Sequence, residues 1–122
     1  MRHDLNQYLD EVAGRLERFP KGVVICWADD TQLGDANFEH WATCASPTRK
    51  RPVYVIAISR ALLRAPKYVL RWLVLHECGH VRLPAWQKGG GGCHHYYFRQ
   101  FERAHPDYIR ANKWLEKAAQ VA

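Results

Sequence analysis

No apolar run in this chain approaches the ~20 residues that a membrane-spanning helix needs. The first residues, Met1-Arg2-His3-Asp4, lead directly into an amphipathic pattern, so the regions that make up a secretory signal are not visible. We therefore expect a cytoplasmic protein that does not cross a membrane.

The cysteines also lack a recognisable pattern. None of the four forms a Cys-x-x-Cys pair, which argues against a structural zinc knuckle. A disulfide framework is not favoured either, because a reducing compartment keeps thiols free. We expect free thiols, with the cysteine beside a histidine pair, Cys93, as a minor candidate ligand. The other three are Cys26, Cys44 and Cys78.

Internal repeats are absent, and the only biased tract is a run of four glycines at 89–92. With 122 residues, 48% of them apolar and 12% aromatic, the composition is typical of a single globular domain over 1–122. The glycine run cannot form a stable element, because glycine has the largest backbone entropy to lose. We expect it to be a loop.

Acidic residues are fewer than basic ones, 12 against 18, which gives a formal net charge of +6. This balance permits contact with nucleic acid but does not demonstrate it. The one tight basic cluster, Arg49-Lys50-Arg51, lies in an expected loop, where such clusters are usually solvated. Nucleic acid is thus a weakly supported partner, and the sequence leaves the oligomeric state open.

The first half of the chain predicts one helix and three strands. Asp4 can cap a helix whose apolar residues recur at helical spacing as far as Phe19, before Pro20. Strands are expected over Val23–Trp27, Phe38–Cys44 and Val53–Ile58. Their short connections favour a small, mainly antiparallel three-stranded sheet.

The second half is helical. Ser59 can cap a short helical turn, and Pro66 and Pro84 bound a helix over about 66–82. Two C-terminal helices are expected after the glycine run, one from Cys93 to Ala104 and one opened by Pro106. The predicted fold class is α+β.

The helix over 66–82 carries His76-Glu77-Cys78-Gly79-His80 near its end. Histidines four residues apart on a helix lie about 40° apart around the axis, so both imidazoles reach one metal ion. Glu77 is placed to touch a metal-bound water. This is the arrangement of a zinc hydrolase, with room for a third ligand and a water molecule. The almost wholly apolar segment before the motif indicates a buried helix, in which such groups are costly unless paired or bound.

The third zinc ligand is not fixed by the residues alone. His94 and His95 follow the glycine loop and begin a helix that can fold back against the motif, and His94 is the preferred candidate. Glu102, two turns beyond His94, is a further candidate ligand, or it could instead bind a ligand histidine. The remaining candidates are His105 and Asp107.

The chain resembles the SprT-like and YgjP-like (WLM-type) zinc metallopeptidases of the zincin class, over roughly residues 38 to 116. Besides the His-Glu-x-x-His motif, residues 40–44 are similar to their Arg-Trp-Gly-Ser-Cys strand, and 62–66 match their Leu-x-x-Ala-Pro step. His94 and Phe98 resemble their His-x-x-x-Phe element, and residues 106–108 with Trp114-Leu115 resemble the YgjP-like tail. The gap between His80 and His94 is longer than is usual in that family.

This resemblance implies a zincin-like fold and zinc-dependent hydrolysis of a peptide or protein substrate. It assigns Zn²⁺ to His76, His80 and His94, and the base to Glu77. One of the residues His95, Tyr96 and Tyr97 would donate to the developing oxyanion. The alternatives are a non-catalytic DNA- or protein-associated module with a structural zinc site, closed by a fourth ligand such as Cys93, and a toxin, antitoxin or regulatory partner without turnover.

Overall fold

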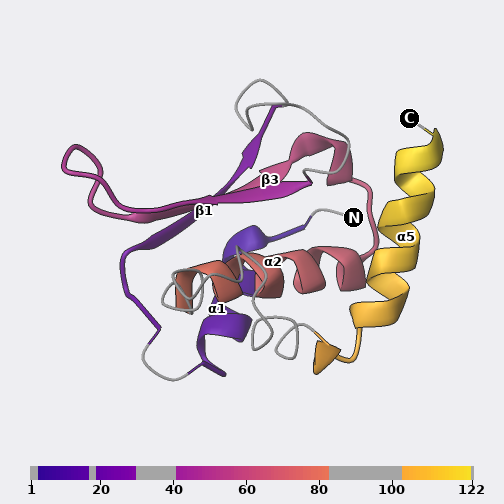
Figure 1. Cartoon of the computed structure of the whole chain (residues 1–122), viewed down its shortest axis with the longest axis horizontal. Helices are drawn as coiled ribbons and strands as arrows, with labels where there is room; N and C mark the ends of the chain where they lie inside the picture. The colour runs from indigo at the N-terminus through magenta and orange to yellow at the C-terminus, as the bar shows by residue number, and fades with distance from the viewer. Residues whose placement is uncertain (1–2, 17–18, 30–40, 83–102, 122) are drawn as a thin grey trace, which may run out of the picture.

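The computed structural model of the chain describes residues 3–16, 19–29, 41–82 and 103–121. Within these ranges the fold is α+β, as predicted, with three α-helices and a three-stranded mixed sheet. Figure 1 shows the sheet on one side of the central helix α2 (Lys67–Arg82), with α5 (Tyr108–Val121) standing across the beginning of α2. In the described part, no helix is long and apolar enough to cross a membrane.

The N-terminal helix α1 (Leu5–Ala13) begins where the sequence predicts. The Asp4 carboxylate accepts a hydrogen bond from the Gln7 backbone N–H at 3.1 Å, so the cap is confirmed. The helix ends earlier than Phe19, because glycine at position 14 is a poor helix former and the following backbone bonds span three residues instead of four. The buried side of α1 consists of Leu5, Tyr8, Leu9 and Val12.

The three strands are β1 (Val23–Ala28), β2 (Ala42–Ala45) and β3 (Tyr54–Ser59), in the order β1-β3-β2. β2 and β3 are antiparallel, but β1 and β3 are parallel over the longer register, from Val23↔Tyr54 to Ala28↔Ser59. The prediction of a mainly antiparallel sheet is therefore wrong. It assumed that strands consecutive in sequence lie side by side, whereas the chain leaves β1, crosses to the far edge as β2 and returns to the centre as β3.

One face of the sheet is covered by α1 and α2, and the core lies between them. The inward residues Ile25, Ile56 and Ile58 are almost fully buried and alternate with more exposed ones, as a half-covered sheet requires. The apolar segment of α2 packs against this face through Val69, Leu70, Trp72, Leu73, Val74, Cys78 and Val81. This packing fixes the orientation of the motif helix.

The start of α2 agrees with the predicted boundary. Ser59 accepts a hydrogen bond from the Ala61 backbone N–H at 3.2 Å and caps the 3₁₀ turn η2 (Arg60–Leu62). The Pro66 carbonyl then accepts from the first turn of α2. Of the two expected C-terminal helices, the second is α5, which starts at Tyr108 and buries Ala111 and Leu115. Residues 93–102 of the first helix, the glycine run and residues 38–40 lie outside the described residues.

Candidate metal centre

The two motif histidines point their outer ring nitrogens at one another. The Nε2 atoms of His76 and His80 are 3.3 Å apart, and the ring planes meet at 76°. Two facing nitrogen lone pairs repel unless one ring donates its N–H to the other or a cation accepts both. The separation equals the edge of a tetrahedral zinc site, about 3.3–3.4 Å for Zn–N bonds of about 2.0–2.1 Å. The pair could therefore take part in holding a metal ion.

Glu77 lies beside this pair and is buried from solvent. Its Oε1 is 4.0 Å from Nε2 of His76, and its side chain is 4% exposed against 17% for His76. One ligand atom from each of the three side chains lies within 4.8 Å of the others, so His76, Glu77 and His80 form a group that could hold a metal ion. Among the described residues this is the only such group.

The local sequence explains this placement. Trp72, His76 and His80 follow one another at intervals of one helical turn, so they lie on the same side of α2. Cys78, between the two histidines, faces the core and is fully buried. Glu77 follows the first histidine by about 100° around the axis. The Glu77 carboxylate therefore lies on the buried side of the histidine pair, and the two imidazoles remain partly exposed to solvent.

Two buried thiols, Cys44 and Cys78, lie near enough to Glu77 for its charge to affect their pKa values. Burial raises the pKa of Cys44, on β2, to about 12, and the charge of Glu77 adds to the shift. Burial raises the pKa of Cys78 to about 12 as well, with Cys44 and Glu77 as further causes. Both shifts favour the neutral thiol over the thiolate in the metal-free chain. The prediction of free thiols is confirmed for Cys26, Cys44 and Cys78.

Aromatic rings extend the row of imidazoles along α2. The Trp72 ring lies 5.4 Å from the His76 ring, and on α5 the Tyr108 ring lies 6.1 Å from that of Trp72. Trp72 precedes His76 by four residues in the sequence, so their contact on a helix could be predicted. The contact with Tyr108 could not, because it depends on how α5 crosses α2.

The candidates for a third ligand fall into two groups. His105 and Asp107 are described but do not join the metal-binding group. Asp107 is buried and accepts hydrogen bonds from Arg110, and its own backbone N–H donates to Nδ1 of His105 at 3.0 Å. These two residues form a structural cluster at the start of α5. The candidate ligands outside the described residues are Cys93, His94, His95 and Glu102, and the candidate oxyanion donors Tyr96 and Tyr97 lie outside them as well.

Comparisons of the chain with protein-family models, with curated proteins and with solved structures find no match. What the site can do therefore follows from its own geometry and chemistry.

Proposed function

We propose that this chain is a zinc-dependent metallopeptidase of the SprT-like and YgjP-like kind, acting on a peptide or protein substrate. The observation that carries the proposal is the His76–His80 pair, with Nε2 atoms at a zinc-site separation of 3.3 Å beside a buried carboxylate. Imidazole nitrogens suit zinc among the common divalent ions, and histidine pairs with an adjacent glutamate are characteristic of zinc hydrolases.

The position of Glu77 favours a base over a ligand. A third ligand of the same tetrahedral ion would lie about 3.3 Å from Nε2 of His76, as His80 does. Oε1 of Glu77 is 4.0 Å away, farther than Nε2 of His80, and this greater distance supports the role of base. From there it can take a proton from a water molecule that attacks the scissile carbonyl, and deliver it to the leaving amine. Zinc at such a site supplies a Lewis acid that polarises the carbonyl and makes the water more acidic.

The edge strand β2 offers a place for an extended substrate. β2 packs against α2, and in the described part of the chain its only strand partner is β3, so its other edge has no partner strand. Cys44 on this strand is close enough to Glu77 for the carboxylate charge to raise the pKa of its thiol. A peptide that adds to the β2 edge by backbone hydrogen bonds would therefore pass near the proposed base.

Removing the metal tests this function. Purified protein loaded with one equivalent of zinc should cleave an unfolded protein substrate such as casein, because unfolded chains can bind as extended strands. A zinc chelator should abolish cleavage, and added zinc should restore it. Cleavage that persists in excess chelator would contradict a metal-dependent mechanism.

The third ligand is tested by a second pair of variants. His94→Ala should weaken zinc binding, whereas His95→Ala should retain zinc and at most slow turnover. In the helix that the sequence predicts from Cys93, adjacent residues would point about 100° apart, so the two side chains would not both reach the ion. Zinc titration of both apo-variants against a competing chelator measures this. Weaker binding by His95→Ala would exchange the assignments, and unchanged binding by both would favour Glu102.

A further inference from the structure

A continuous row of rings joins the C-terminal helix to the proposed metal ligands. From α5, Tyr108 contacts Trp72 at 6.1 Å between ring centres, and Trp72 contacts His76 at 5.4 Å. His76 then meets His80 edge-on, with ring centres 5.0 Å apart. Trp72 is 5% exposed, so its position is set by the side chains around it. An imidazole in such a row has little freedom to turn.

We propose that Trp72 and Tyr108 are positioning residues for His76, so that α5 forms part of the metal site. This inference rests on the proposed zinc function and adds a determinant of it. Removing a group that orients a ligand histidine typically weakens metal binding by about 10- to 100-fold. Here the orienting contacts are made between aromatic rings, and one of the rings, that of Tyr108, lies about thirty residues after the motif.

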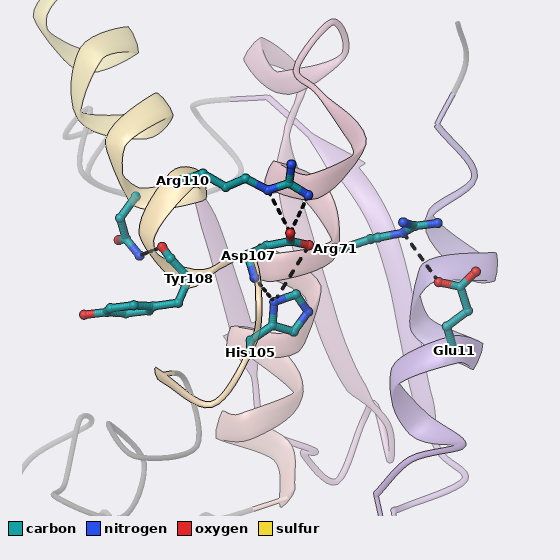
Figure 2. Close-up of polar contacts among 7 residues, drawn as sticks. Glu11, Arg71, His105, Asp107, Tyr108 and Arg110 are labelled. Atoms are coloured by element: carbon teal, nitrogen blue, oxygen red, sulfur yellow. Dashed lines mark hydrogen bonds and ion pairs between the residues drawn. The ribbon is translucent and has the colours of Figure 1, made fainter.

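The start of α5 is held firmly enough to serve this role. Figure 2 shows the Asp107 carboxylate accepting from Arg110 on the same helix, with His105 on its other side. The Asp107 backbone N–H donates to Nδ1 of His105, which therefore carries its proton on Nε2. Burial lowers the pKa of His105, outweighing the opposite effect of the Asp107 charge, and so favours this neutral form. Tyr108 follows directly after this cluster.

Further contacts hold the same turn, one with α2 and one within α5. The guanidinium of Arg110 lies 4.1 Å from the centre of the Tyr68 ring, a close cation–π contact between the two helices. The Tyr108 carbonyl accepts a hydrogen bond from the side-chain amide of Asn112 at 2.7 Å. These contacts hold the backbone at Tyr108, and with it the position of the Tyr108 ring beside Trp72.

The identity of residue 72 supports a role for its ring. Its indole N–H is buried, and among the described residues it has no hydrogen-bond partner. A buried donor without an acceptor lowers stability, and a leucine or phenylalanine would fill the core without that cost. The compensating gain available to an indole here is its large ring surface, which contacts Tyr108 and His76 at once.

Zinc affinity of Tyr108 variants tests the proposal. Tyr108→Ala should raise the zinc Kd by about tenfold, in the range found when groups that orient a ligand are removed. Tyr108→Phe keeps the ring and should bind zinc as the wild type does. In the cobalt(II)-loaded protein, Tyr108→Ala should also shift the visible absorption bands, which report ligand geometry and do not respond to a general loss of stability.

Leu115→Ala is the matched control. Leu115 is a buried residue of the same helix, and the row of rings does not include it. Its variant should lower the melting temperature and leave zinc affinity and the cobalt spectrum unchanged. Equal zinc affinity in Tyr108→Ala and wild type, or equal weakening in Leu115→Ala, would overturn the inference and leave the zinc site intact. A wild-type chain that binds no zinc would overturn both.

Discussion

Replacing either motif histidine by alanine should abolish tight zinc binding. His76→Ala and His80→Ala each remove one of two nitrogens that lie 3.3 Å apart, and the ligands that remain are too few to hold the ion tightly. Wild-type protein should carry about one zinc per chain. Because a bound metal stabilises only the folded state, zinc at 100 times its Kd should add about 2.7 kcal/mol to the unfolding free energy of the wild type. Neither variant should show that gain.

Metal analysis and thermal unfolding with and without zinc measure these effects. His3→Ala is a suitable control, because His3 contacts the Tyr8 hydroxyl and the Ala65 carbonyl and takes no part in the metal-binding group. It should lower stability equally with and without zinc, and keep full metal content. Full zinc occupancy in His76→Ala or His80→Ala would remove the basis of the proposed function.

Glu77→Gln should separate catalysis from metal binding. The amide has the shape of the carboxylate but cannot accept the proton of the attacking water. Zinc content should stay near one per chain, while the peptidase rate should fall by ~10²-fold or more. The rate of casein cleavage by zinc-loaded protein is the measurement.

Glu11→Gln provides a matched control for this substitution. Glu11 lies on the surface of α1, where it pairs with Arg71 at 3.6 Å, and exposed pairs of this kind contribute little. Its variant should cleave at the wild-type rate. If Glu77→Gln lost its zinc as well, Glu77 would be a ligand. An unchanged cleavage rate would show that Glu77 is not the base.

Local signals in the sequence predicted much of the fold. The Asp4 cap, the Ser59 cap and the start of the motif helix after Pro66 are each set by contacts between residues close in the chain. The strands around Ile25 and Ile56 were visible as short apolar runs between turn residues. The spacing of His76 and His80 is likewise local, since a regular helix alone brings their nitrogens together.

Features that depend on tertiary contacts were not predictable in the same way. The parallel pairing of β1 with β3 follows from the crossing of the chain to the far edge of the sheet, which no residue pattern records. The approach of Cys44 to Glu77 depends on how β2 packs against α2. The contact of Tyr108 with Trp72, and the Asp107–Arg110 pair that supports it, depend on how α5 crosses α2.

The central claim is that His76 and His80 hold one zinc ion and leave a position open for water. Anomalous diffraction at the zinc edge, from crystals grown with one equivalent of zinc, tests it most directly. We expect one peak per chain, within bonding distance of Nε2 of both histidines, with a third protein ligand and one solvent ligand. A zinc ion bound elsewhere, or one enclosed by four protein ligands with no solvent, would contradict the account.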